Sequence, residues 1–303
     1  MGLASSKPRN VLSHPPTPGH NSAYALVTGA TSGIGRSLAV ELCRRGLNVI
    51  VHGRDPVRLN ALIKDLREKY PSRDIRGLVL DAATAFTASG ETGQEAWNAL
   101  FSITDLNLKI LVNNVGIGHN PAKDFITFTE QTPAQITQLI QVNISFMTFL
   151  TYALLPTLQR NATPSNPSFV INSGSLAELG LPWVSVYSGT KGYITAFSKA
   201  LDTELKGEGQ HVEVISALIG DTDSDGHKVG TSLFTPSSDH MASMILDSAA
   251  GAGAGPVARV PYWGHLIQLW LCKLQPYRLL QKGMIYNVTG LREKNGLVAK
   301  KQA

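Results

Sequence analysis

The chain has 303 residues, of which 43% are hydrophobic and 16% are charged, and this composition excludes disorder of the whole chain. Its two cysteines, Cys43 and Cys272, are isolated in the sequence and exclude a disulfide-stabilised scaffold. The net charge is +5, but residues 273–303 alone carry +6, so the rest of the chain is nearly neutral and lacks the basic stripe of a nucleic-acid enzyme.

Residues 1–22 contain four prolines and few apolar side chains, which predicts a disordered leader before the folded part. The leader has no apolar signal-peptide segment, and no run of about 18 uninterrupted apolar residues follows it. We therefore expect a cytoplasmic protein. The residues from Met1 to Ser6 fit the N-myristoylation pattern, so lipidation of Gly2 and, with the basic C-terminal part, peripheral contact with a membrane stay open.

Short apolar runs alternate with segments of helical periodicity between residues 24 and 218. The apolar runs predict six strands, at 24–28, 48–51, 77–80, 110–112, 168–171 and 212–218. The periodic segments predict helices at 34–45, 56–70, 95–103, 133–158 and 186–206. Such alternation predicts an α/β fold of the Rossmann type, in which a doubly wound parallel sheet forms a single domain over 23–220.

The pattern loosens after residue 218, where we expect a substrate loop and a C-terminal helical extension with a basic tail over 221–303. Residues 220–238 predict a mobile loop, residues 251–255 a hinge, and residues 266–280 a helix that packs on the body or lies on a lipid surface. The segment from Asp221 to Gly226 opens like a calcium-binding EF-hand loop. Because Ser232 stands where such a loop needs a Glu, we predict a solvated acidic loop and no metal site.

A glycine-rich turn separates the first predicted strand from the first predicted helix. Glycines there let the backbone approach a pyrophosphate, and the helix N-terminus supplies free N–H groups. The turn therefore predicts a dinucleotide site whose cofactor-binding residues are Thr28, Gly29, Thr31, Ser32, Gly33, Ile34 and Gly35.

The tip of the second predicted strand selects between the two nicotinamide dinucleotides. It carries His52, Gly53 and Arg54 but no acid, and Arg pairs with a 2′-phosphate whereas an acid pairs with a 2′-hydroxyl. We therefore favour NADP(H). Asp55 would face the ribose in another register, although a role as N-cap of the following helix, with Pro56 at its first position, explains it equally well.

Tyr187 and Lys191 stand four residues apart at the start of a predicted helix, so that both side chains lie on one face. A Lys ammonium beside a phenol favours the phenolate, which makes Tyr187 usable as a general acid or base near neutral pH.

These motifs, together with the run Asn113-Asn114-Val115-Gly116, resemble the short-chain dehydrogenase/reductase family in kind and order over about residues 23–220. The stretches 184–193, 234–237 and 261–265 are most similar to the 17β-hydroxysteroid dehydrogenase/3-ketoacyl-CoA reductase branch, in particular to its fungal members. The resemblance implies that the candidate site residues are Tyr187, Lys191, Asn143, Asn113, Asp81 and an upstream serine.

The resemblance also implies a role for each position. Tyr187 would deliver a proton to a carbonyl while NADPH delivers a hydride, Lys191 would also bind the nicotinamide ribose, and Asn143 would hold a water of a proton relay. Asn113 would brace the central sheet beside the cofactor, and Asp81 would contact the adenine.

The catalytic serine has two candidates. Ser175, twelve residues before Tyr187, fits the family's strand motif best, whereas the usual spacing of thirteen falls on Gly174. Ser173 remains the alternative. The family's usual Pro-Gly after the last strand is replaced here by Ile219-Gly220, which leaves the contact of this loop with the nicotinamide open.

We thus expect an NADPH-dependent carbonyl reductase that acts on a bulky apolar ketone. The apolar side chains between residues 220 and 265 would line the substrate entrance or would simply pack on the body. They are Leu233, Phe234, Met241, Met244, Ile245, Tyr262 and Trp263. His119 follows the turn after Asn113-Asn114-Val115-Gly116 and would lie on the rim of the site, with contact to the substrate as the alternative.

Two alternatives stay open. One is an NAD(P)⁺-dependent alcohol or hydroxysteroid dehydrogenase, and the other a membrane-tethered nucleotide-binding protein with little catalysis. A homo-oligomer paired through the predicted helices 133–158 and 186–206 is a further expectation.

Overall fold

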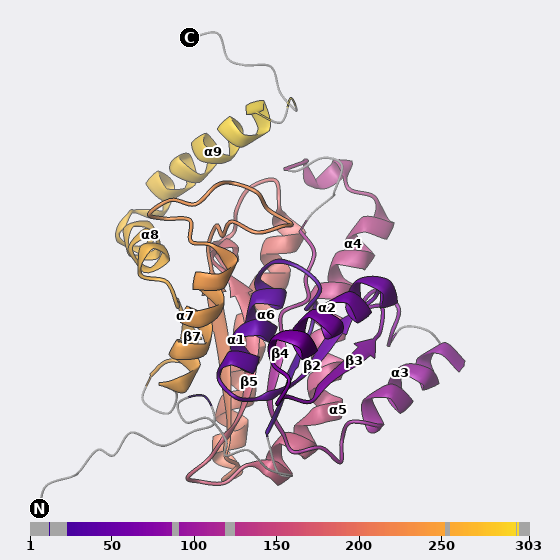
Figure 1. Ribbon diagram of the computed structural model, residues 1–303. Helices are drawn as coiled ribbons and strands as arrows, with labels where there is room; N and C mark the ends of the chain where they lie inside the picture. The colour runs from indigo at the N-terminus through magenta and orange to yellow at the C-terminus, as the bar shows by residue number, and fades with distance from the viewer. Residues whose placement is uncertain are drawn as a thin grey trace, which may run out of the picture.

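A seven-stranded parallel sheet forms the centre of the computed structural model, which describes residues 12, 23–86, 91–118, 125–251, 255–294 and 296 (Figure 1). The strand order is β3-β2-β1-β4-β5-β6-β7, and every neighbouring pair is parallel. The strands are β1 (Tyr24–Val27), β2 (Asn48–Gly53), β3 (Ile75–Val79), β4 (Leu108–Asn113), β5 (Ser168–Ser175), β6 (Val212–Ile219) and β7 (Ala258–Arg259). The predicted α/β Rossmann-type fold in one domain is confirmed.

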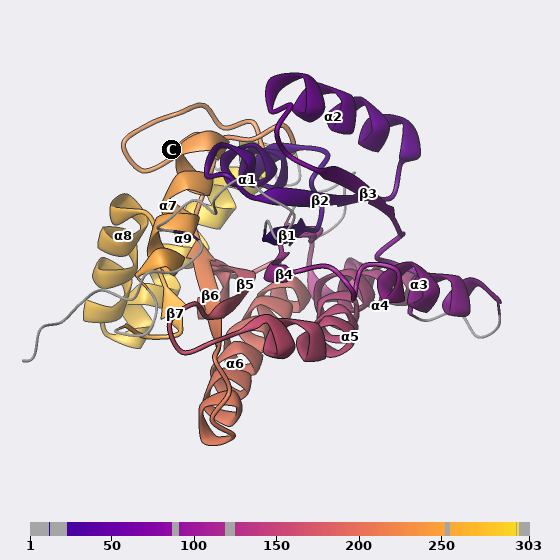
Figure 2. The same ribbon diagram turned by 60° about the horizontal axis from the view of Figure 1, so that its bottom comes forward.

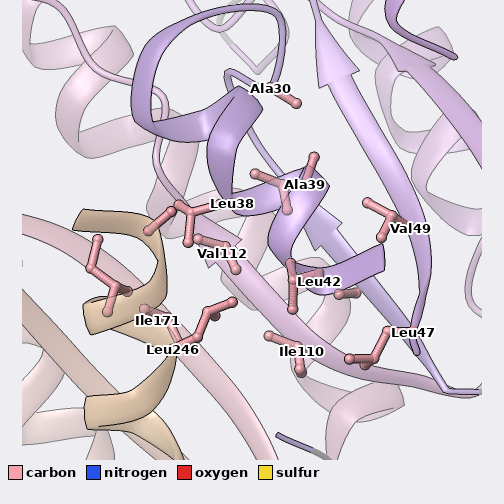
Figure 3. Packing of buried hydrophobic residues seen from close by; sticks show 14 of the residues in the cluster. Ala30, Leu38, Ala39, Leu42, Leu47, Val49, Ile110, Val112, Ile171 and Leu246 are labelled. Atoms are coloured by element: carbon pink, nitrogen blue, oxygen red, sulfur yellow. The ribbon is translucent and has the colours of Figure 1, made fainter. Parts of the chain in front are cut away.

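Helices cover both faces of this sheet (Figure 2). One apolar cluster packs α1 (Gly33–Arg44), α2 (Pro56–Lys69) and α7 (Ser238–Ala250) on the first face. Figure 3 shows the part of it in which Leu38 and Leu42 of α1 and Leu246 of α7 lie together over the strands, on one face of the sheet. The second cluster packs α3 (Glu91–Phe101), α5 (Phe146–Asn161) and α6 (Ser185–Gly207) on the opposite face.

Two helices at the C-terminal end, α8 (Trp263–Leu274) and α9 (Tyr277–Lys294), lie beside α7 at the β7 edge, away from α3 (Figures 1 and 2). The prediction of a single helix over 266–280 is wrong, because the helical conformation is interrupted at Gln275 and Pro276. Proline lacks the N–H that would continue the first helix, yet it is tolerated at the start of the second.

Neither β7 nor α7 was among the elements predicted from the sequence. Met241 and Ile245 are buried in α7 against the sheet, so these two side chains pack on the body and do not line a substrate entrance. Leu233, Phe234 and Trp263 are exposed, whereas Tyr262 is buried.

The long helix predicted over 133–158 is present but not regular. It begins as α4 (Pro133–Ile140), passes through one π-helical turn, η2 (Gln141–Ser145), and continues as α5. By length and hydropathy alone, Pro133–Asn161 could cross a membrane. Its buried side packs on β4 and β5 in the manner of a core helix.

The segment from Gly220 to Ser237 is held by hydrogen bonds rather than lying free. The Asp223 carboxylate accepts from the N–H groups of Val229 and Gly230 at 3.2 and 3.1 Å. His265, fully buried, accepts from the Gly220 N–H at 3.1 Å through Nδ1. A Cβ on Gly220 would lie 2.7 Å from the His265 ring, so the start of the loop is fitted to this side chain.

Candidate active site

The glycine-rich turn lies at the carboxyl end of β1, where β1 and β4 are adjacent and the strand order reverses. Gly29 and Gly33 have φ angles of +63° and +52°, which side chains disfavour. A Cβ on Gly35 would lie only 2.1 Å from the Gly29 carbonyl oxygen. Ser32 makes no capping hydrogen bond through its side chain, so it leaves the N-terminal N–H groups of α1 uncapped, and the turn forms a backbone cradle that fits a pyrophosphate.

Thr28 joins this turn to β4. Its buried hydroxyl donates to the Val112 carbonyl and accepts from the N–H groups of Asn114 and Val115, at 3.2, 2.9 and 3.0 Å. The Asn114 amide donates to the Thr28 carbonyl at 3.1 Å. The two strand ends that border the cradle are thus fixed to one another.

His52 braces the cradle from the side of β2, a role that sequence reasoning missed. Its Nδ1 accepts from the Gly29 N–H at 3.2 Å, and its Nε2 lies 3.1 Å from the Leu80 carbonyl, so Nε2 carries the proton. Burial lowers the pKa of His52 to about 4, and the ring stacks on Phe146 at 5.1 Å. A neutral imidazole in this single tautomer links the glycine-rich turn to the ends of β2 and β3.

The tip of β2 carries the two residues considered for nucleotide choice. Asp55 is the N-cap of α2, and its carboxylate accepts from the N–H groups of Val57 and Arg58 at 2.9 and 3.3 Å. Arg54 is exposed, and its side chain makes no hydrogen bond or ion pair within the described part of the chain. Its guanidinium is therefore free to reach a phosphate, whereas the Asp55 carboxylate is occupied.

An acidic side chain lies over the same cradle. Asp225, from the loop after β6, accepts from the Gly33 N–H at 3.3 Å, and a Cβ on Gly33 would lie 3.3 Å from the Ser224 Cβ. From the sequence we expected this acidic stretch to be solvated, within a loop beside the substrate. Its carboxylate instead lies at the N-terminus of α1, where we expect the cofactor's phosphates.

Asn113, at the end of β4, belongs to a buried polar chain behind the site. Its amide donates to Thr151 Oγ1 and to Asn172 Oδ1 at 3.0 and 2.8 Å, and Asn172 in turn donates to Ser198 at 2.9 Å. This chain of hydrogen bonds ties β4 and β5 to α5 and α6 behind the site.

Tyr187 and Lys191 lie in the first turns of α6. The Lys191 ammonium is buried, donates to the Ser173 carbonyl at 2.8 Å and lies 5.5 Å from the centre of the Tyr187 ring. A Cβ on Gly116 would lie 3.8 Å from Lys191 Nζ. The ammonium therefore sits between the phenol, the end of β5 and the loop after β4.

Asn143 is held inside the π-helical turn. Its Oδ1 accepts from the Ile117 N–H and its Nδ2 donates to the Ile117 carbonyl, both at 2.9 Å, and Nδ2 also reaches Thr190 Oγ1 at 3.1 Å. A π-helical turn frequently marks a functional site because it redirects one side chain. Here it aims Asn143 at the loop after β4 and at the helix of Tyr187 and Lys191.

Both serine candidates lie on one face of β5. Ser175 accepts from the Ala177 N–H at 3.1 Å and is half-buried, while Ser173 is buried and donates to the Asn114 amide oxygen at 3.4 Å. Gly174 faces the other way, since a Cβ there would lie 2.7 Å from Ser216 Oγ. The usual spacing to the tyrosine thus falls on a position that points away from the other two.

Asp81 follows β3 and is exposed, with its carboxylate accepting from the Ala83 N–H at 3.0 Å. His119 and the leader residue Gly2 lie outside the described residues. Among the residues that the structure describes, no three His, Cys, Asp or Glu side chains form a group able to hold a metal ion.

Comparison with known proteins gives a consistent result. The family described as short chain dehydrogenase matches residues 23–231. A very-long-chain 3-oxoacyl-CoA reductase from Coprinopsis cinerea is 30% identical over 256 residues, which cover 81% of this chain and 70% of the relative. A putative steroid dehydrogenase 4 from Caenorhabditis elegans is 32% identical, covering 83% of this chain and 90% of the relative.

Solved structures agree on the fold. A short-chain dehydrogenase from Sphingobium yanoikuyae in complex with NADPH has a TM-score of 0.65 and 23% identity, covering 93% of this chain and 98% of its own. An alcohol dehydrogenase specific for bulky-bulky ketones from Comamonas testosteroni has a TM-score of 0.63 and 23% identity, covering 85% of this chain and 96% of its own.

Proposed function

Because the chain belongs to the short-chain dehydrogenase family, and is therefore an oxidoreductase of that family, we propose that it is an NADPH-dependent reductase of ketones. The observation that supports this most is the convergence of Tyr187, Lys191 and Asn143 beside the cradle at the end of β1. The cradle fits a dinucleotide phosphate, and the three side chains fit proton transfer to a carbonyl oxygen.

The residues that would hold NADPH are those of the glycine-rich turn, with Arg54 at the 2′-phosphate and Asp81 at the adenine. The preference for NADPH over NADH rests on the exposed Arg54 and on the engagement of Asp55 by α2. When bound, the cofactor supplies the hydride, and the protein's own groups manage the proton.

Tyr187 donates the proton from its hydroxyl to the substrate oxygen, and the Lys191 ammonium stabilises the phenolate that remains. Lys191 is positioned for this by the Ser173 carbonyl, which accepts a hydrogen bond from its ammonium group. Asn143 fixes the loop after β4 through Ile117 and would hold the water of the relay. Ser175 is our choice for the hydroxyl that orients the substrate carbonyl, with Ser173 as the alternative.

We propose a bulky apolar ketone, including the 3-oxoacyl thioester class, as the substrate. The relative from Coprinopsis cinerea carries the name of such an enzyme. The exposed side chains Leu233, Phe234 and Trp263 offer apolar contacts around the loop that covers the cradle. The same residues serve the reverse oxidation, so an alcohol or hydroxysteroid dehydrogenase remains the alternative reading.

Tyr187→Phe tests the proposal. We expect it to abolish NADPH-dependent reduction of apolar ketones while NADPH binding, followed by fluorescence titration, stays within about twofold, because only the proton donor is lost. Tyr193→Phe is the matched control on the same helix, since its hydroxyl lies 3.1 Å from Thr148 and outside the proposed machinery. Turnover near the native rate in Tyr187→Phe would refute the assignment.

Cofactor choice is tested by titrating NADPH and NADH separately. Binding of NADPH at least about tenfold tighter, a difference of about 1.4 kcal/mol, is expected for the native chain and should vanish in Arg54→Gln. Tighter binding of NADH would contradict the role of Arg54. Absence of binding by both would contradict the dinucleotide site and, with it, the reductase proposal.

Pairing of two copies and peripheral contact with a membrane also stay proposals. For pairing, α5 offers the exposed side chains Phe149 and Tyr152.

A further inference from the structure

An apolar stripe of α8 faces solvent instead of the protein body. Its members recur at helical spacing along one side of the helix, whereas His265 and Leu269 on the other side are buried. An amphipathic helix on a globular protein normally buries its apolar side. The exposed members, here called the α8 stripe, are Trp263, Leu266, Ile267, Trp270, Leu271 and Leu274.

The surface around the α8 stripe is apolar as well. On α9, Tyr277, Leu279, Ile285 and Tyr286 are at least half exposed, and Tyr286 reaches 82%. Fourteen of the 21 exposed large apolar side chains of the described residues belong to α8, α9 or the loop at Val229–Phe234. A concentration of this kind on one part of a surface marks an interaction site rather than ordinary exposure.

The same two helices hold most of the protein's excess charge. Residues 263–294 contain five basic side chains and one acidic one, a net charge of +4 against +5 for the whole chain. Lys273, Arg278, Lys282 and Lys294 are all exposed. Apolar and aromatic side chains mixed with long basic ones are the composition of helices that lie in a membrane interface.

We propose that α8 and α9 dock the protein on an anionic lipid surface, with the α8 stripe inserted among the acyl chains. A second copy of the chain fits less well, because a symmetric contact through this face would bring two surfaces of +4 together. An anionic bilayer complements both properties at once: it accepts apolar side chains, and each basic residue near its surface is attracted to its headgroups.

The docking face also borders the proposed active site. The Arg292 guanidinium of α9 stacks on the ring of Trp183 at 4.7 Å, and Trp183 precedes Tyr187 by four residues. Trp183 has a φ of +61°, an uncommon backbone conformation held in place in the loop that leads into α6. If the proposed function holds, an apolar ketone dissolved in the bilayer would reach the site along this edge.

Cosedimentation of the unlipidated full chain with lipid vesicles tests the docking surface. We expect binding to phosphatidylcholine vesicles that contain about a third phosphatidylserine, and much weaker binding to phosphatidylcholine alone. Raising the salt from about 0.15 M to about 1 M should weaken the binding, because the screening length falls from ~8 to ~3 Å. The double variant Trp270→Ser/Leu271→Ser should lower the partition coefficient at least about tenfold.

Val57→Ser is the matched control, since Val57 is 76% exposed on α2, away from the docking face. Native binding by the Trp270→Ser/Leu271→Ser variant, or no binding of the native chain to anionic vesicles, would overturn the proposal. So would a dimer, seen by light scattering, that the double variant dissociates. The assay contains neither cofactor nor ketone, so failure of the reductase assignment leaves its outcome unaffected.

Discussion

Protonation of His52 should make the protein acid-labile, because its neutral ring is built into the nucleotide cradle. Nδ1 accepts a hydrogen bond from the Gly29 N–H, and an imidazolium has no acceptor to offer there. Burial lowers the pKa of His52 to about 4 in the folded chain, against an ordinary value of 6.5. At a pH between these two pKa values, His52 is protonated in the unfolded chain and neutral in the folded chain. The free energy of unfolding therefore falls as the pH falls.

The size of this effect follows from the two pKa values. At 1.36 kcal/mol per unit, His52 removes about 2 kcal/mol of stability between about pH 7 and pH 5, and about 3 kcal/mol by pH 4. His265, whose pKa is also lowered by burial, adds a further loss in the same direction. A variant is therefore needed to separate the contribution of His52 from the rest.

His52→Gln keeps an acceptor and a donor in the ring's place but does not titrate. We expect urea unfolding, followed by circular dichroism, to show native stability falling by about 2 kcal/mol more than that of His52→Gln between about pH 7 and pH 5. His211→Gln, at an exposed histidine, is the control and should keep the native slope. Equal slopes for the native chain and His52→Gln would refute the reasoning.

Three further predictions concern the nucleotide cradle. Gly35→Ala places a Cβ 2.1 Å from the Gly29 carbonyl and should weaken NADPH binding at least about tenfold in fluorescence titrations; an unchanged Kd would contradict the cradle. Asp225→Asn removes a negative charge that accepts from the Gly33 N–H, so NADPH should bind about two- to fivefold tighter at low salt and equally at high salt. Asp55→Ala should cost about 1 kcal/mol of unfolding free energy as a lost N-cap; a changed ratio of NADPH to NADH affinity would show instead that Asp55 reads the ribose.

The core of the fold could be predicted from the sequence because its signals are local. Strands such as β1 and β6 are buried on both faces and appear as short apolar runs. The edge strand β7 has only two residues, which is too short for any pattern. The π-helical turn could not be predicted either, because hydrophobic periodicity does not show whether a backbone N–H bonds to the carbonyl four or five residues earlier.

The candidate site divides in the same way. The glycine-rich turn and the pair Tyr187 and Lys191 are contiguous motifs, so their residue types and spacing carry the prediction. The role of His52 depends on its hydrogen bonds with Gly29 and Leu80. The Asp225 carboxylate accepts from the N–H of Gly33, a residue 192 positions earlier in the sequence. Contacts of that kind depend on how loops meet after the sheet has formed, and a single sequence does not encode them in any local pattern.

The fit between Gly220 and His265 has a consequence for recombining this protein with its relatives. The loop after β6 begins against an imidazole supplied by α8, some 45 positions later in the chain. Grafting that loop from a homologue would bring in a new residue at position 220 without the residue at position 265 that packs against it. Any residue larger than glycine at position 220 would collide with the His265 ring. Productive chimaeras should therefore exchange the two segments as one block, and residues 220 and 265 should vary together among close relatives.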